Sequence, residues 1–413
     1  MTDMTFFRAA GVFDAVRPGL RAGSGLLVQD GRVAAVGPPA DVCPPGAAQV
    51  DLGDVYLVPG FVDAHTHVTI RPGEGDQHGQ LQRPAAWQTV RGVDNLRRML
   101  ASGVTTARIM TEEHDIDVHF KAAVAAGEVA GPRLRVAGRG LSPSGKHGSA
   151  AGGVDGADAA RAAVRANAAK GADHIKIFTT GGVSSTDTSL EESNYSAEEI
   201  TAIVDAAAQL GLMVSAHAHG GAGVDLAAAA GVRSVEHGAL LTEQNIAALV
   251  AHGTWLVLTN TILFHPTGIE QGDAAEPAIL AKVRQARASM ESAVGRIRAA
   301  GLPIALGTDS MHGLFGYEMQ WLVEHGWSAE DALLAGTVRG AELMGVTDIG
   351  ALEPGRRADF VALRRDPLQD IDAVREVAGV YRDGHRVVDA DGFTRPAPSS
   401  DDGRAPTHRE EQP

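Results

Sequence analysis

The segment 59–67 ends with two histidines in the pattern His65-Thr66-His67. In an extended strand, residues i and i+2 point to the same side, so His65 and His67 can direct both imidazoles at one point. Imidazole nitrogens are common ligands of zinc and of neighbouring divalent transition metals. This pair therefore indicates a metal site, and the remaining ligands of that site must come from elsewhere in the chain.

Further residues that could bind a metal lie near the ends of other apolar runs. These residues are Lys176, His217, His237 and Asp309. Each has an ordinary explanation when taken alone: a structural histidine, a lysine that reaches solvent, or an aspartate that caps a helix. In a barrel of parallel strands, however, functional side chains gather at the C-terminal ends of the strands. Their joint occurrence therefore predicts a single metal site.

Eight short apolar runs could form the strands that position these residues, and helical patterns lie between them. The runs are 60–67, 104–109, 133–137, 173–178, 212–217, 232–236, 254–258 and 302–308. One of the helices is predicted by the capping box Ser196–Glu199, which is followed by an apolar face. The alternation predicts an α/β fold, a (β/α)8 TIM barrel, although periodicity alone leaves a doubly wound sheet open.

Both ends of the chain contain hairpin signals. Asp30-Gly31 separates two β-rich runs near the start, and Asp383-Gly384 does the same near the end. We therefore expect residues 1–58 and 350–394 to form one small β-sandwich domain beside a barrel formed by residues 59–349. The tail 395–413, which is rich in Pro, Ser, Asp and Glu, is expected to be disordered.

Composition narrows the class of protein. The 413 residues carry a formal net charge of −15, which argues against nucleic acid and against anionic membranes as partners. The single cysteine, Cys43, excludes an intrachain disulfide and cysteine metal clusters. Neither a signal peptide nor an apolar run of about 18 residues is present. These features predict a cytoplasmic protein without a membrane partner.

At this point the sequence resembles the amidohydrolase superfamily. The nearest group is the imidazolonepropionase-like proteins, which include metal-dependent Xaa-Pro and Xaa-Arg dipeptidases and the ochratoxin-hydrolysing amidase. The matching motifs are Pro59-Gly60-Phe61-Val62-Asp63-Ala64-His65-Thr66-His67, Gly171-Ala172-Asp173-His174-Ile175-Lys176, His217-Ala218-His219-Gly220, Glu236-His237-Gly238 and Gly307-Thr308-Asp309-Ser310.

The resemblance implies a centre with two divalent metal ions, expected to be zinc. His65 and His67 would bind one metal together with Asp309, and His217 and His237 would bind the other. Lys176 would bridge both metals as a carboxylated lysine, because an ammonium group cannot ligate a cation whereas a carbamate offers two anionic oxygens.

The resemblance also implies a reaction: a metal-bridging hydroxide attacks the amide carbonyl of a small molecule such as a dipeptide, an N-acyl amino acid or an aryl amide. The expected catalytic residues are Asp309, which moves the proton, His237, and His147 and His219 as donors to the oxyanion. The candidate substrate-binding residues are His147, His219, Tyr195, His265 and Arg108.

Two other functions are alternatives to this hydrolase. A mononuclear deaminase or cyclic-amide hydrolase would lack the bridging lysine, so Lys176 favours the binuclear enzyme. A barrel that only binds a metabolite would not need all six ligand positions intact. The expected partner is a small-molecule amide, and a homo-oligomer is expected because relatives often assemble.

Overall fold

Eight parallel strands occupy the centre of the structure. The computed structural model describes residues 4–149, 152–186, 188–389 and 392–393. The eight strands are β8 (Phe61–Thr66), β9 (Val104–Ile109), β10 (Arg133–Val136), β11 (His174–Phe178), β12 (Met213–Ala218), β13 (Ser234–His237), β14 (Trp255–Leu258) and β15 (Ile304–Leu306). Each coincides with a strand predicted from the sequence. They form a three-stranded sheet, β10-β9-β8, and a five-stranded sheet, β11-β12-β13-β14-β15.

The edges of these two sheets lie beside one another. At one junction, an isolated parallel bridge joins Leu141, after β10, to Ile177 in β11. At the other, the backbone N–H of Asp309, after β15, donates to the carbonyl of His65 in β8 at 2.8 Å. Gly307 permits this approach, because a Cβ at that position would lie 2.5 Å from the Cβ of His65.

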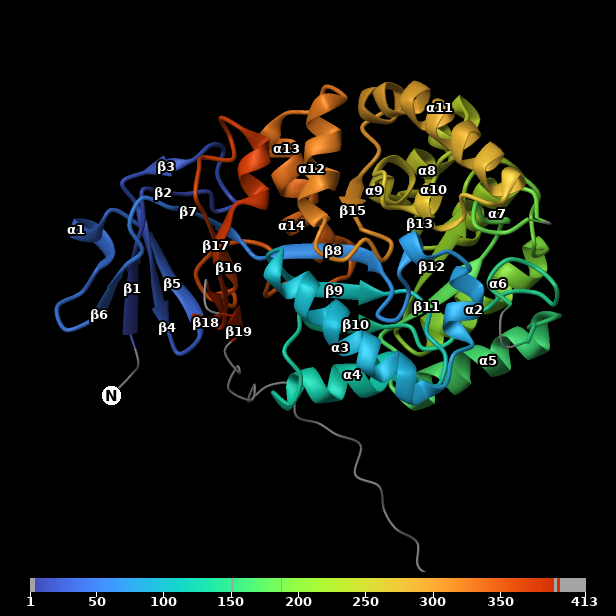
Figure 1. Cartoon of the computed structure of the whole chain (residues 1–413), viewed down its shortest axis with the longest axis horizontal. Helices are drawn as coiled ribbons and strands as arrows, with labels where there is room; N and C mark the ends of the chain where they lie inside the picture. Colours follow the sequence, from blue (N-terminus) through green and yellow to red (C-terminus); the bar gives the residue numbers. More distant parts are fainter. Residues whose placement is uncertain (1–3, 150–151, 187, 390–391, 394–413) are drawn as a thin grey trace, which may run out of the picture.

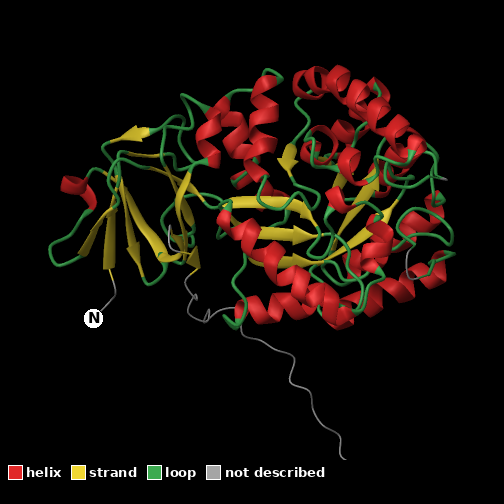
Figure 2. Ribbon diagram, viewed as in Figure 1, coloured by secondary structure: helices red, strands yellow, loops and turns green. Residues whose placement is uncertain are grey.

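Helices follow the strands and surround them (Figure 2). The principal ones are α3 (Ala85–Ala101), α4 (Ile116–Ala125), α5 (Ala157–Lys170), α6 (Ala197–Gln209), α7 (Gly221–Ala230), α8 (Glu243–His252), α11 (Pro277–Ala299), α12 (Phe315–Glu324), α13 (Ala329–Ala335) and α14 (Val338–Leu343). The capping box predicted for α6 is confirmed, since the Ser196 side chain accepts from the Glu199 N–H and Glu199 binds back to the Ser196 backbone. The α/β alternation of the sequence is therefore the alternation of the structure.

The two ends of the chain come together in two further sheets, seen at the left of Figure 1. One sheet has the order β5-β4-β1-β6 and the other β19-β18-β17-β16-β7-β2-β3. Their strands are β1 (Met4–Arg8), β2 (Gly11–Val12), β3 (Arg21–Ala22), β4 (Gly25–Gln29), β5 (Arg32–Gly37), β6 (Ala48–Asp51), β7 (Tyr56–Pro59), β16 (Phe360–Leu363), β17 (Val377–Arg382), β18 (His385–Asp389) and β19 (Gly392–Phe393). Both predicted hairpins are confirmed, as the antiparallel pairs β4–β5 and β17–β18.

Aromatic packing holds these end sheets together. The Phe7 ring from the first sheet lies 5.1 Å from the ring of Phe360 and 5.5 Å from that of Tyr381, both in the second sheet. Burying one such side chain stabilises a fold by about 1.5–3 kcal/mol. Arg133 of β10 forms ion pairs with Asp359, just before β16, and with Asp383, in the turn between β17 and β18, and so ties the end sheets to the central strands.

Two further predictions concern the C-terminal tail and membrane-spanning helices. The predicted disordered tail, 395–413, lies outside the described residues. Within the described ranges, none of the helices combines the length and apolarity needed to cross a membrane.

Candidate active site

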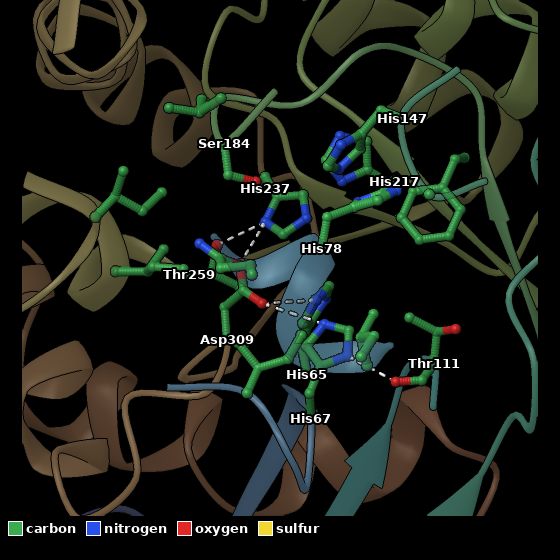
Figure 3. A pocket seen from close by; sticks show the side chains of 18 of the residues that line it. His65, His67, His78, Thr111, His147, Ser184, His217, His237, Thr259 and Asp309 are labelled. Atoms are coloured by element: carbon green, nitrogen blue, oxygen red, sulfur yellow. Dashed lines mark hydrogen bonds and ion pairs between the residues drawn. The ribbon is translucent and has the colours of Figure 1, made fainter. Parts of the chain in front are cut away.

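A cavity opens at the C-terminal ends of the central strands (Figure 3). Its empty volume is about 810 Å³, a figure that includes space open to solvent, and all six predicted metal ligands line it. They are His65, His67, Lys176, His217, His237 and Asp309. His65 and His217 lie within their strands, His237 is the last residue of β13, and Asp309 follows β15. Residues from five different strands therefore converge on one point, as the strand-end rule predicts.

Asp309 lies at the centre of the cluster. Its Oδ1 is 3.5 Å from His65 Nε2 and 3.4 Å from His67 Nε2, and its Oδ2 is 3.8 Å from His237 Nδ1. Potential ligand atoms of His65, His237 and Asp309 all lie within 4.8 Å of one another. The ring centroids of His217 and His237 are 4.6 Å apart. These donor atoms are therefore close enough to bind metal ions together.

Each of the four histidines is held by a hydrogen bond through one ring nitrogen. The pairs are His65 Nδ1 with Glu236 Oε2 at 2.7 Å, His67 Nδ1 with the Thr111 carbonyl at 2.9 Å, His217 Nε2 with the Gly181 carbonyl at 3.1 Å, and His237 Nδ1 with Thr259 Oγ1 at 2.8 Å. Such partners fix the tautomer and orientation of a metal-binding imidazole. The second nitrogen of each ring remains available as a ligand.

Lys176 is the unusual member of the cluster. Its side chain is buried, with 1% of the residue's surface exposed, and no hydrogen bond or ion pair to it is found in the described part of the chain. Its Nζ lies 5.3 Å from the centroid of the Phe178 ring. Burial lowers the pKa of Lys176 to about 8, against the opposing influence of Glu236 and Asp309. A buried ammonium without a partner is costly, so this position favours a neutral or chemically modified amine.

The electrostatics of the cavity suit a bound cation. Burial and the neighbouring imidazoles hold the pKa of His217 and that of His237 well below the usual value, which keeps both rings neutral. Burial opposes the ionisation of Asp309, but hydrogen bonds from His65 and His67 outweigh it and hold the pKa of that carboxyl well below its usual range. Neutral imidazoles and an ionised carboxylate are the protonation states in which these groups bind a divalent metal.

The backbone at two of the ligands adopts a conformation that side chains disfavour. The φ angles are 73° at His237 and 46° at Asp309, and Ser310 follows at 74°. A non-glycine residue in this region costs on the order of 1–3 kcal/mol and persists where the surrounding structure enforces it. Such strain is concentrated at functional sites, which supports the assignment of this cavity.

Two of the proposed substrate-contacting residues, His147 and His219, also line the cavity. The His147 Nδ1 binds Ser185 Oγ at 2.7 Å, while the buried Nδ1 of His219 has no partner among the described residues. Burial lowers the pKa of each ring to about 3. Both residues are therefore placed as neutral hydrogen-bonding groups facing the ligand cluster.

Three other candidates are not brought to the cavity, which corrects the expectation that they contact substrate. Arg108 is buried beneath the ligands, where its guanidinium pairs with Glu236 at 2.9 Å. The Tyr195 hydroxyl donates to the Val154 carbonyl at 3.2 Å. His265 packs edge-on against Tyr317 and does not line the cavity.

The sequence analysis did not predict the role of Glu236, which orients the ligand histidine His65. This buried carboxylate accepts from His65 Nδ1 and from Arg108 Nη2. Burial opposes its ionisation, but the charge of Arg108 prevails and lowers the pKa of Glu236 to about 2. The available signal was a charged residue inside an apolar strand immediately before a ligand.

Comparison with known proteins assigns the family. The amidohydrolase family profile matches residues 56–387 of the chain. The chain belongs to the amidohydrolase family. As a member, it is a hydrolase that acts on carbon–nitrogen bonds, and the resemblance stated from the sequence is confirmed.

Individual relatives cover most of this amidohydrolase. Ochratoxinase of Aspergillus niger is 29% identical over 392 residues, which cover 86% of this chain and 80% of that protein. The imidazolonepropionase of Cereibacter sphaeroides is 27% identical over 384 residues, which cover 83% and 88%. A solved Xaa-Pro dipeptidase with methionine bound in its active site superposes with a TM-score of 0.85 at 25% identity, covering 93% of this chain and 99% of that one. The structural likeness supports an α/β fold of the TIM-barrel type.

The pairing of Arg108 with Glu236 generates a stability prediction. Arg108→Met should lower the free energy of unfolding by about 3–5 kcal/mol, because it leaves the Glu236 charge buried without its counter-ion. The measurement is urea unfolding followed by circular dichroism.

Arg135→Met is the matched control. Arg135 is paired with Arg108 in the register of β9 and β10, but its own side chain is 43% exposed, and its partner Asp173 also pairs with Lys121. We expect this variant to change stability by less than about 1 kcal/mol. Equal losses in the two variants would contradict the role assigned to the buried pair.

Proposed function

We propose that this amidohydrolase is a binuclear metal enzyme that cleaves the amide bond of a small molecule such as a dipeptide, an N-acyl amino acid or an aryl amide. The observation that carries the proposal is Lys176, which is buried, forms no hydrogen bond or ion pair with the described residues through its side chain, and lines the cavity shared by four histidines and Asp309. A carbamate formed on its Nζ would turn this isolated amine into an anionic ligand. The names of two relatives, ochratoxinase and Xaa-Pro dipeptidase, support the reaction class.

The donor set allows two metal ions, which we expect to be zinc, to be assigned to residues. His65, His67 and Asp309 would hold one metal, and His217 and His237 would hold the other, with carboxylated Lys176 between them. When bound, the metals supply a nucleophilic hydroxide near neutral pH and polarise the scissile carbonyl. Glu236, Thr111, Gly181 and Thr259 would keep the four imidazoles oriented throughout the reaction.

Asp309 would move the proton. Its carboxylate contacts three ligand histidines and lies on the cavity wall, so it would accept a proton from the attacking water and return it to the leaving nitrogen. Neither step requires a covalent acyl-enzyme.

His147 and His219 would bind and orient the amide. The Ser185 hydroxyl engages Nδ1 of His147, so Nε2 would serve the substrate, and Nδ1 of His219 has no hydrogen-bond partner among the described residues. Either ring could donate to the carbonyl oxygen as charge develops on it. His237 would act here as a metal ligand beside them.

The alternative, a mononuclear deaminase or cyclic-amide hydrolase, gains no specific support. A one-metal centre would leave Lys176 buried without a role.

We also propose the finer architecture: a closed (β/α)8 barrel over residues 59–349, and a β-sandwich formed by residues 1–58 and 350–394. Homo-oligomeric assembly, a cytoplasmic location and a small-molecule amide as the partner stay predictions.

Replacement of Lys176 tests the bridging ligand. Lys176→Met should lose at least one metal ion per chain and lower kcat/KM by at least about 100-fold, because methionine fills the space without supplying an anionic oxygen. Elemental mass spectrometry and an amide-cleavage assay on the same sample measure both effects.

Lys176→Glu separates ligation from packing. Its carboxylate can take the place of the carbamate, so we expect it to recover metal that Lys176→Met has lost. Two metals and full activity in Lys176→Met would refute the binuclear proposal and return the mononuclear alternative to first place.

Asp309→Asn tests the proton transfer. The amide oxygen can still coordinate a metal but cannot accept a proton, so we expect most of the metal to be retained while kcat falls by about 100- to 10,000-fold. Near-normal kcat at full metal content would remove Asp309 from this role.

A further inference from the structure

The outer part of the cavity is apolar. Its wall is built from Leu81 of α2 (Gln77–Leu81), Val183 after β11, Ile262 and Leu263 of α9 (Asn260–Phe264), and Ile269 of α10 (Ile269–Gly272). All five side chains are buried, with exposed fractions between 3% and 8%. A ligand group that packs against them would be removed from water along with these surfaces, which favours an apolar group.

Hydrogen bonds hold the wall in place. The 3-10 helix η1 (Pro72–Glu74) and α10 contact each other. Gln271 Nε2 donates to the Gly73 carbonyl at 3.2 Å, and the Asp76 N–H donates to Asp273 Oδ1 at 3.2 Å. Two loops far apart in the sequence are thereby fixed to each other above the metal ligands.

Away from the proposed metal ions, the cavity offers little to an anionic substrate group. Lys176 is the single lysine or arginine among the lining residues in the described part of the chain. The ammonium of Lys282, which influences His219 electrostatically, binds the carbonyls of Gly182, Ser185 and Thr188. Arg108, expected to bind a carboxylate, is committed to Glu236.

A negative charge also faces this space. Glu113 lines the cavity, and apart from Asp309 it is the one carboxylate among the lining residues described. Its partner Arg139 is 3.8 Å away and does not line the cavity. A substrate carboxylate placed against this wall would lose its hydration without gaining a cationic partner and would be repelled by Glu113.

We propose that the substrate is an amide that has no free carboxylate and carries an apolar group that packs against the wall formed by α2, α9 and α10. The inference rests on the proposed amide hydrolysis and narrows it, since it disfavours unblocked dipeptides and N-acyl amino acids and favours blocked or aryl amides. The apolar group occupies the outer cavity while the scissile carbonyl faces the ligand cluster.

A matched pair of substrates tests the charge preference. N-hexanoyl-phenylalanine and its N-methylamide share the scissile bond and the apolar groups and differ in the carboxylate. With hexanoate release as the readout, kcat/KM should be at least about 10-fold higher for the N-methylamide. Equal values, or a preference for the carboxylate, would overturn the inference.

Ser184 provides a gain-of-function variant, because it lines the cavity and is only partly buried. Ser184→Arg would place a guanidinium beside the substrate and should reduce the preference for the neutral compound at least about 5-fold. Ser184→Gln, which is polar but uncharged, should leave the ratio within about 2-fold. An unchanged ratio in Ser184→Arg would count against the proposal.

Binding to the Asp309→Asn variant separates the two proposals, because turnover is suppressed there. Isothermal titration calorimetry should give a Kd at least about 5-fold lower for the N-methylamide. If wild-type protein cleaves neither compound while this binding preference holds, amide hydrolysis fails and the inference about charge stands. If both are cleaved but the carboxylate binds more tightly, the inference fails and the proposed function stands.

Discussion

The burial of the ligand side chains, five of them almost fully and Asp309 to 14% exposure, is the constraint on which the rest of the site depends. Removed from water, His217 and His237 stay neutral while Asp309 stays ionised, so these ligands present neutral nitrogens and a carboxylate. Such a set is stable only when every remaining polar atom has a partner. Glu236, Thr111, Gly181 and Thr259 provide those partners for the imidazoles. The Lys176 side chain has none among the described residues, and its Nζ is therefore the atom on which we expect a carbamate to form.

The fold supplies this arrangement through the ends of its parallel strands. Backbone pairing fixes the spacing between neighbours: Phe178 pairs with His217, and Ala218 pairs with His237. The turns that follow are strained at His237 and Asp309. A buried second layer of charges, Arg108 with Glu236, lies beneath and is itself electrically balanced. Stability and ligand orientation are consequently linked through the same ion pair.

The extent to which the sequence predicts this site follows from the range of the interactions. The convergence of the six candidate ligands was predictable because two rules suffice: side chains at i and i+2 share a face, and parallel strands end at one side. Arg108 was expected to contact substrate because the alternation of side chains along a strand directs it toward the inside of the fold. It lies there beside Glu236, with which it pairs, and it does not line the cavity. Tyr195 and His265 lie in loops whose course depends on contacts such as the Tyr195 hydroxyl with Val154, and no periodicity encodes those contacts. The apolar wall of α9 and α10 was likewise beyond reach, since those short helices are set by tertiary packing.

The central claim is that the six converging residues hold two metal ions that hydrolyse an amide. Its most direct test is elemental mass spectrometry of protein purified without chelator, with amide cleavage assayed on the same sample. The account predicts about two divalent metal ions per chain, with zinc the leading element, and measurable cleavage that chelation abolishes and metal restores. No bound metal even after reconstitution, or cleavage that is indifferent to chelation, would contradict it.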